Sequence, residues 1–350
     1  MPNDSERAGR PWWSGRLLLR VALVAAAVAL LVYPWLVPNS YLRYAGVLVI
    51  MYAALSTSWN LVGGFTGYVS LGHAAFFGLG AYATGLGVVR LGLDHVVALV
   101  LSALLTMVFA VVVGLAAVRV RGSSFVIVSI ALVTMMSLIA QDARGLTGGS
   151  SGLRVPPISE SLDRAGNHLL FFNLFLALLA VVLLTWRFID RSRFGAGLKA
   201  IREDEDKAES LGVPTTAYKV AIFALSAGFT AIAGGLYGMW FGNLDPIFLF
   251  SIIVGVNMVL MALLGGVRHL FGPLLGALIV APANEYFLTR FGESQLHIVL
   301  SGAILAVVVL FMPDGIIPAV RTLLRRFRPE AASIREQTQA QLHDQQEVNA

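Results

Sequence analysis

The stretch Arg191-Ser-Arg-Phe-Gly-Ala-Gly-Leu-Lys-Ala-Ile-Arg-Glu-Asp-Glu-Asp-Lys-Ala-Glu-Ser-Leu-Gly-Val-Pro214 interrupts a chain that is otherwise mostly apolar. Residues 187–209 hold 12 of the 45 charged residues, and we call the segment 189–216 the charged island. Gly212 suits the left-handed backbone that ends a helix, and Pro214 cannot continue one. The spacing therefore predicts a short helix over residues 197–211. Its apolar stripe contains Leu198, Ile201, Ala208 and Leu211 and is interrupted by Asp204 and Glu205.

The composition assigns the chain to a broad class. Hydrophobic residues make up 57% of it and charged residues 13%, with a mean hydropathy of +0.78, whereas charged residues are about a quarter of a soluble protein. We therefore expect an integral membrane protein embedded in the lipid bilayer. The 35 glycines fit that class because small residues let membrane helices approach closely. The formal charge of +5 is not interpreted as affinity for nucleic acid.

Apolar stretches near 20 residues, the length that crosses a hydrocarbon core of ~30 Å, predict an all-α transmembrane bundle. About ten occur, at residues 17–33, 42–62, 69–89, 95–118, 124–140, 168–188, 217–241, 248–266, 272–289 and 296–312. The third is rich in Ser and Gly, so a broken or re-entrant segment remains an alternative to a span. The first lacks a small-residue cleavage site and is interpreted as a retained span.

The distribution of basic residues predicts the orientation. With a cytoplasmic N-terminus, 19 Lys and Arg residues fall on the inner side and 6 on the outer side, as the positive-inside rule expects. The chain then divides into a cytoplasmic N-terminal segment (1–16), a transmembrane domain (17–312) and a polar cytoplasmic tail (313–350). The charged island and both termini are expected to be cytoplasmic.

Polar residues and glycines within or beside the spans are candidates for a translocation path, since polar groups in a membrane normally face a cavity or another helix. The candidates are Asn60, Thr66, Gly67, Ser70, Gly72, His73, Asn257 and Glu285. Two alternatives stay open: the glycines serve helix packing, and His73 is an interhelical hydrogen-bonding group. Glu285 also lies near enough to the outer end to reach the interface or pair with Arg290.

Catalytic motifs are absent from the sequence. It contains no phosphate-binding Gly-x-x-x-x-Gly-Lys-Ser/Thr loop and no His-Glu-x-x-His zinc helix. Its six histidines are scattered, and cysteine does not occur. We therefore expect no catalytic site, metal or cofactor, and any ATP hydrolysis must take place in a separate subunit.

Three stretches together resemble one family. They are Trp59-Asn-Leu-Val-Gly-Gly-Phe-Thr-Gly-Tyr-Val-Ser-Leu-Gly-His-Ala-Ala-Phe-Phe-Gly-Leu-Gly-Ala-Tyr82, Leu146-Thr-Gly-Gly-Ser-Ser-Gly-Leu153, and the island from Gly197 to Glu205 with Gly212-Val. The chain is similar, over residues 59–313, to the permease subunits of bacterial ABC importers for branched-chain amino acids, the LivM type. Asp206-Lys207 and Ser151 depart from the usual pattern of that family.

This resemblance implies a multi-pass subunit of the bacterial inner (plasma) membrane that works by alternating access. Its expected partners are a second related permease, two ATP-binding subunits and an extracytoplasmic substrate-binding protein. The residues expected to couple to the ATPase are Gly197, Leu198, Ile201, Arg202, Glu203, Asp204, Glu205 and Gly212.

Two other functions remain open. A permease for urea or short-chain amides would look similar, and the binding protein encoded alongside would distinguish it. An ion-coupled secondary transporter would need carboxylates at the middle of the membrane and internal repeats, whereas the spans here are nearly free of carboxylates.

Overall fold

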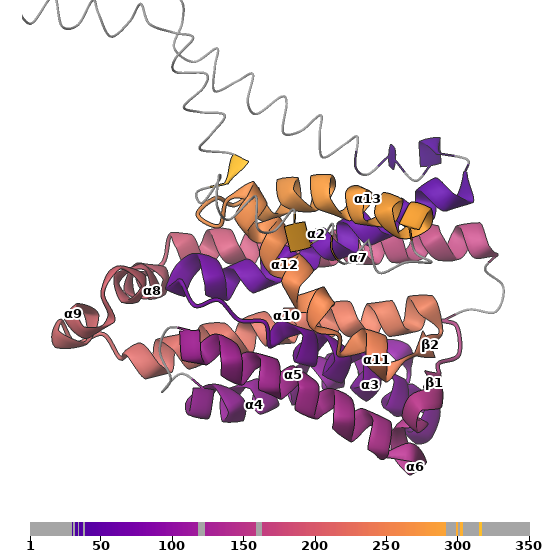
Figure 1. Ribbon diagram of the computed structural model, residues 1–350, viewed down its shortest axis with the longest axis horizontal. Coiled ribbons are helices and arrows are strands. Elements are labelled where there is room, and N and C mark those ends of the chain that lie inside the picture. Colours follow the sequence, from indigo (N-terminus) through magenta and orange to yellow (C-terminus); the bar gives the residue numbers. More distant parts are fainter. Residues whose placement is uncertain are drawn as a thin grey trace, which may run out of the picture.

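The computed structural model is a bundle of long helices (Figure 1). It describes residues 39–117, 123–158 and 163–291, with a few isolated positions between 30 and 37 and between 299 and 316. The elements are α2 (Ser40–Thr66), α3 (His73–Leu91), α4 (His95–Ala117), α5 (Ser123–Asp142), α6 (Arg144–Thr147), η2 (Gly149–Ser151), β1 (Leu153–Arg154), α7 (Arg164–Asp190), α8 (Arg193–Glu203), α9 (Glu205–Ser210), α10 (Thr215–Phe241), β2 (Asn243–Leu244), α11 (Pro246–Leu249), α12 (Ile252–Gly265) and α13 (Gly272–Phe291).

Seven helical segments in the described part of the chain are long and apolar enough to cross a membrane. They correspond to the second through eighth expected spans, the last formed by α11 and α12 together. The third is a continuous helix from His73 onward rather than a broken one. The ninth forms α13, a 20-residue helix that contains Pro282 and is not among the seven. The tenth and almost all of the first lie outside the described residues, so the count of ten stays a prediction.

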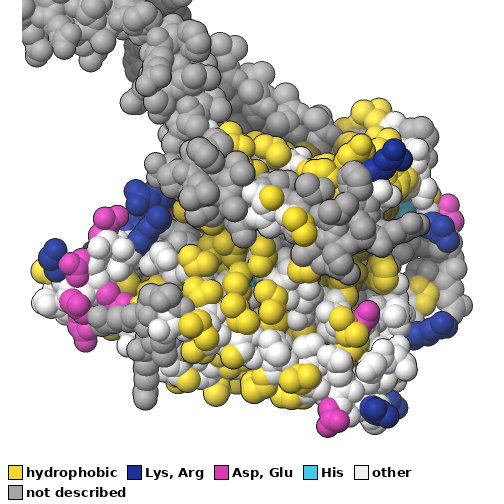
Figure 2. Space-filling model, in the orientation of Figure 1, with side chains coloured by type: hydrophobic (Ala, Val, Ile, Leu, Met, Phe, Trp, Pro, Cys, Tyr) yellow, Lys and Arg dark blue, Asp and Glu magenta, His cyan; other side chains and the backbone are white. Residues whose placement is uncertain are grey.

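The bundle has two distinct ends. Helices α8 and α9 lie at one end, and the antiparallel pair β1–β2, with Leu153 opposite Leu244, lies at the other (Figure 1). Figure 2 shows charged side chains gathered at these two ends, with apolar side chains between them. This banded surface is the one that a bilayer requires, because charged groups are expensive in hydrocarbon.

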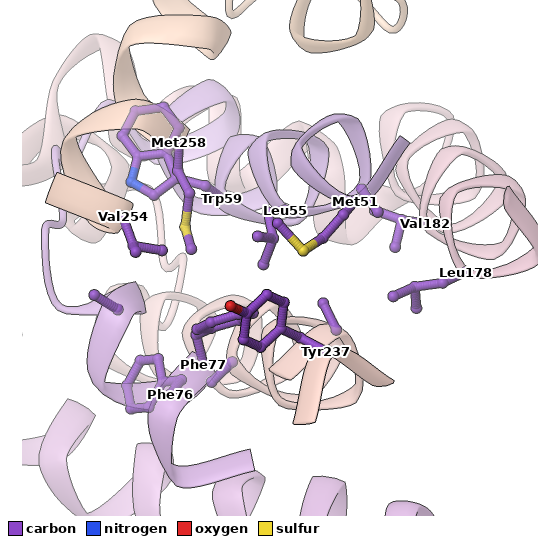
Figure 3. Close-up of a cluster of buried hydrophobic side chains, with 14 of the residues drawn as sticks. Met51, Leu55, Trp59, Phe76, Phe77, Leu178, Val182, Tyr237, Val254 and Met258 are labelled. Carbon is purple, nitrogen blue, oxygen red and sulfur yellow. The ribbon is translucent and has the colours of Figure 1, made fainter. Parts of the chain in front are cut away.

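The core forms where α2 and α10 meet their neighbours. α2 packs against α7, α10, α12 and α13, while α10 packs against α3 and α4. Figure 3 shows buried side chains of α2, such as Met51, Leu55 and Trp59, facing Phe77 of α3 and Tyr237 of α10. The outer helices α4 and α5 instead expose long apolar rows, which suit contact with lipid.

The contact between α3 and α10 depends on glycines, whose lack of a side chain lets the two backbones approach closely. A Cβ at Gly234 would lie 2.0 Å from the carbonyl oxygen of Phe77, and one at Gly80 would lie 2.3 Å from the carbonyl oxygen of Ala231. Both positions therefore require glycine, because the two backbones touch there. Gly80 therefore serves the packing of α3 against α10.

Candidate functional site

The charged island consists of two helices rather than the single helix expected over residues 197–211. α8 begins at a cap in which Ser192 Oγ accepts a hydrogen bond from the Gly195 amide at 3.0 Å. It ends at Asp204, whose backbone is extended (φ −160°, ψ 109°) and whose Oδ1 accepts from the Lys207 amide at 3.0 Å to begin α9. Aspartate favours such caps because its side chain competes for backbone amides. Gly212 adopts φ +84°, which confirms the left-handed stop.

The predicted apolar stripe turns inward. Leu198 is 0% exposed, Ile201 3% and Ala208 1%, so these three side chains are buried by the rest of the same chain. Leu211 behaves differently, with 83% of its surface exposed. Leu198, Ile201 and Ala208 therefore pack inside the subunit. The role of Leu198 and Ile201 in coupling to an ATPase stays a prediction. Helical periodicity identified a buried face but not what buries it.

Arg202 ties α8 to the end of α2. Its Nη1 donates a hydrogen bond of 2.5 Å to the carbonyl oxygen of Gly64, which lies in the last turn of α2. Burial lowers the pKa of Arg202, and the nearby guanidinium of Arg268 lowers it further. Arg202 is thus a partly buried anchor of the island rather than a charge on its rim.

Glu205 ties α9 to two other parts of the bundle. Its Oε1 lies 2.5 Å from Nζ of Lys219 in the first turns of α10, and its Oε2 accepts a 2.7 Å hydrogen bond from the hydroxyl of Tyr68. The side chains of Lys219 and Glu205 are 4% and 13% exposed. The Lys219 ammonium also lies 5.3 Å from the centroid of the Tyr68 ring. We call these three residues the clasp, and it holds α9 against α10 and the segment 67–72.

The segment 67–72 leads from the clasp into a buried polar cluster. Trp59 Nε1 donates to the carbonyl oxygen of Ser70 at 2.6 Å, and the Leu71 amide donates to Ser129 Oγ at 3.1 Å. The segment is therefore fixed to α2 and to α5. Ser70 in turn lies next to His73, the first residue of α3.

Both ring nitrogens of His73 have partners. Nδ1 lies 3.2 Å from Ser70 Oγ, and Nε2 lies 2.8 Å from Ser226 Oγ of α10. Because the Ser226 hydroxyl donates to the carbonyl oxygen of Ser58 at 2.6 Å, it can only accept from His73, so Nε2 carries the proton and Nδ1 accepts from Ser70. His73 is fully buried and joins α3 to α10 and, through Ser226, to α2. This is the interhelical hydrogen-bonding role.

The candidate path residues fall into two groups. Thr66, Gly67, Ser70, Gly72 and His73 gather near the island, where Gly67 has φ +76° and Thr66 Oγ1 bonds back to the Val62 carbonyl oxygen at 2.8 Å. Asn60 lies two turns from the end of α2 and is fully buried. Neither its side-chain oxygen nor its nitrogen finds a partner among the described residues.

Asn257 and Glu285 belong to the second group, on α12 and α13. Asn257 Oδ1 accepts from Asn284 at 3.0 Å, and a side-chain hydrogen bond links Asn257 to Tyr52 of α2. Glu285 is half-buried and makes no ion pair with Arg290 within the described chain. The two groups are therefore separate in the structure, and the role of these residues in a translocation path stays a prediction.

Sequence reasoning missed the clasp and the partners of His73. Lys219 and Glu205 are 14 positions apart, and Ser226 is 153 positions from His73, so no short-range pattern relates them. One usable signal was Lys219 itself, an isolated cation at the start of an apolar run, which requires a compensating group when buried. Among the described residues, no group of three or more His, Cys, Asp and Glu could hold a metal ion.

Comparison with known proteins agrees with this architecture. Residues 40–310 match the family described as the permease component of the branched-chain amino acid transport system. The chain is 26% identical to the high-affinity branched-chain amino acid transport system permease protein LivM of Salmonella typhimurium strain LT2, covering 88% of this chain and 76% of the relative. It is 27% identical to the high-affinity branched-chain amino acid transport system permease protein BraD of Pseudomonas aeruginosa, covering 76% of this chain and 91% of the relative.

An archaeal relative shows how widely the likeness extends. The probable branched-chain amino acid transport permease protein LivM of Methanocaldococcus jannaschii is 22% identical, covering 77% of this chain and 90% of the relative. No solved structure matches the chain. Because the family match runs from the start of α2 through α13 and includes both the island and the clasp, the chain belongs to the family of branched-chain amino acid transport permeases.

Proposed function

We propose that the chain is the transmembrane permease subunit of an ATP-driven importer for branched-chain amino acids. Its family membership and the assignment of its relatives LivM and BraD as branched-chain amino acid permeases support the substrate class. The absence of a phosphate-binding loop from the sequence supports separate ATPases. In this proposal it works in a plasma membrane with a second permease subunit, two ATP-binding subunits and an extracytoplasmic binding protein.

The charged island faces the cytoplasm and receives the ATPase. The 19-to-6 division of basic residues in the sequence supports this orientation. It also agrees with the position of α8 and α9 together at one end of the bundle (Figure 1). The opposite end, which carries β1 and β2, then faces the binding protein.

The observation that carries the coupling proposal is the clasp. A force applied to α9 reaches Glu205, and Glu205 is bonded to Lys219 of α10 and to Tyr68 of the segment 67–72. That segment ends at Ser70 and His73, where α2, α3 and α10 are hydrogen-bonded together. Motion of the island is thus passed to the helix ends through buried polar contacts rather than through a flexible loop.

The surface that meets the ATPase is the outer side of α9. Leu211 is a large apolar residue left exposed directly after α9, and the exposed charged residues Asp206, Lys207 and Glu209 precede it in that helix. α9 is also the described helix that projects furthest from the bundle at this end (Figure 1). An apolar anchor with a charged rim is the usual composition of an energetically important contact.

Two substitutions separate docking from folding. Leu211→Asp places a charge on an exposed residue, so the permease should insert into the membrane and keep its unfolding midpoint. It should bind its ATPase at least tenfold more weakly, as expected when a contact that contributes ~1.4 kcal/mol or more to binding is lost. Ile201→Asp buries a charge inside the permease and should instead reduce the amount of folded protein. Binding is measured with purified ATPases and vesicles carrying each variant.

Leu146→Asp is the matched control. Leu146 is 54% exposed and lies near the opposite end of the bundle, so the same change there should leave ATPase binding unaltered. Unchanged binding by Leu211→Asp would exclude the α9 surface as the docking site.

The transport claim is tested with the complete reconstituted complex. Uptake of labelled leucine should require ATP, should persist when ion gradients are dissipated, and should be inhibited by isoleucine and valine. Inhibition by urea or short amides, with none by isoleucine, would instead identify an amide permease.

A further inference from the structure

A cavity of about 240 Å³ lies beneath the charged island. It is bounded by the last turns of α2 and α7, by α8, and by the connection between α12 and α13. Its walls include Phe65, Trp186, Lys199, Arg202, Glu203 and Arg268. The established transport role of the family does not require a cavity at this position, since the clasp already joins the island to the bundle.

The charges around the cavity leave two guanidinium groups for a ligand. Lys199 is already paired with Asp190, at 2.6 Å, and Arg202 uses Nη1 on the Gly64 carbonyl oxygen. Arg268 makes no ion pair or hydrogen bond to any described residue. Glu203 is the one remaining acidic group of the lining, so the site carries a net positive charge.

Two aromatic side chains line the cavity near the ends of two helices that are long and apolar enough to cross a membrane. Phe65 and Trp186 pack with ring centroids 5.3 Å apart, one and four residues before the ends of their helices. The indole N–H of Trp186 is buried and has no acceptor among the described residues. Leu184 and Phe188 lie two positions before and after Trp186, on the opposite face of α7, and are 69% and 77% exposed. This face gives α7 an apolar surface suited to contact with lipid.

We propose that this cavity binds the phosphate group of a phospholipid. Guanidinium groups donate in a fixed fork that suits phosphate oxygens, and basic pockets between membrane helices on the cytoplasmic side are typical headgroup sites. Arg202 and Arg268 hold the phosphate, and the acyl chains extend from it into the bilayer. Because Arg202 also anchors α8 to α2, the bound lipid stabilises the seat of the island.

The test is native mass spectrometry of the purified chain titrated with phosphatidylglycerol. Arg268→Gln should weaken lipid binding about tenfold, the loss expected for one charge-assisted hydrogen bond. Arg193→Gln is the matched control, because Arg193 is an exposed arginine at the same end that does not line the cavity, and it should bind within about twofold of the wild type. Arg268 is itself exposed, so its variant should fold normally.

Further arms identify the chemistry and its source. Trp186→Phe keeps the ring and should weaken binding about threefold if the indole N–H reaches the ligand. Diacylglycerol, which lacks the phosphate, should bind no better to the wild type than to Arg268→Gln. Displacement of the lipid by millimolar inorganic phosphate would assign the site to a free anion, and displacement by leucine would assign it to a carboxylate. Equal lipid binding by Arg268→Gln and Arg193→Gln overturns the proposal.

Discussion

The clasp gives a quantitative prediction, because it contains a buried ion pair whose two partners can be removed separately. Lys219→Met removes the ammonium group that Glu205 contacts, and Glu205→Gln removes the carboxylate charge that Lys219 contacts, at a site where the lysine side chain is 4% exposed. Breaking a buried pair from one side costs about 3 kcal/mol. In a chain of this size that corresponds to a fall of roughly 4 °C in the unfolding midpoint.

The double variant should lose much less than the sum of the two single losses. Removing both charges leaves no buried ion, so we expect a coupling energy of about 2 kcal/mol. The assay is thermal unfolding of the four proteins in the same detergent, followed by intrinsic fluorescence, with ATPase stimulation measured in parallel. Tyr68→Phe, which removes one hydrogen bond to Glu205, should cost about 1 kcal/mol.

The pair formed by Lys199 and Asp190 is the control. Its atoms are 2.6 Å apart, nearly as close as those of the clasp, but the side chains are 50% and 27% exposed. Water screens such a pair, so its coupling energy should stay below about 0.5 kcal/mol. If the clasp shows no larger coupling than this control, burial does not strengthen it, and the reasoning that makes it the transmitter fails.

Three further outcomes follow from the packing and the caps. Gly234→Ala should lower the unfolding midpoint strongly because its Cβ would collide with the Phe77 carbonyl oxygen. Gly145→Ala should leave the midpoint unchanged because the space around Gly145 is open. Equal midpoints for the two variants would contradict the close contact. His73→Leu removes the acceptor of the Ser70 hydroxyl and the donor to the Ser226 hydroxyl and should cost about 2 kcal/mol, with leucine uptake falling only as folded protein falls. Normal stability with altered uptake would favour a path-lining His73 instead. The Lys207 amide lowers the pKa of Asp204, so its cap contributes at neutral pH and is lost as the pH falls through that lowered value. In the wild type, limited proteolysis of α9 should accelerate as the pH falls through the pKa of Asp204. In Asp204→Ala, which lacks the cap, proteolysis should be fast at every pH.

The spans were predictable because a bilayer imposes a length and a composition that can be read from consecutive residues. The expected spans at 42–62 and 217–241 lie within α2 and α10, and the helix stop at Gly212 was correct. The break at Asp204 was not predicted, because residues on either side of it continue one apolar stripe. A cap depends on a single side chain reaching one amide, and that choice leaves no periodic signal.

The candidate site was only partly predictable, because its contacts join residues far apart in the chain. His73 and Arg202 were selected for their chemistry, but their partners Ser226 and Gly64 come from other helices. Hydropathy also could not tell whether Ile201 faces a partner protein or its own bundle. That distinction depends on tertiary packing, which encloses Ile201 and leaves Leu211 in water.

The glycine contact between α3 and α10 has a mechanical consequence. With backbone atoms touching at Gly80 and Gly234, neither helix can slide or rotate past the other without collision, because close-packed interfaces are not continuously deformable. Any change of conformation must therefore carry α3 and α10 together as one lever. We therefore expect any rearrangement of the bundle to occur between this pair and neighbours of α10 such as α2 and α7, not between the two helices of the lever.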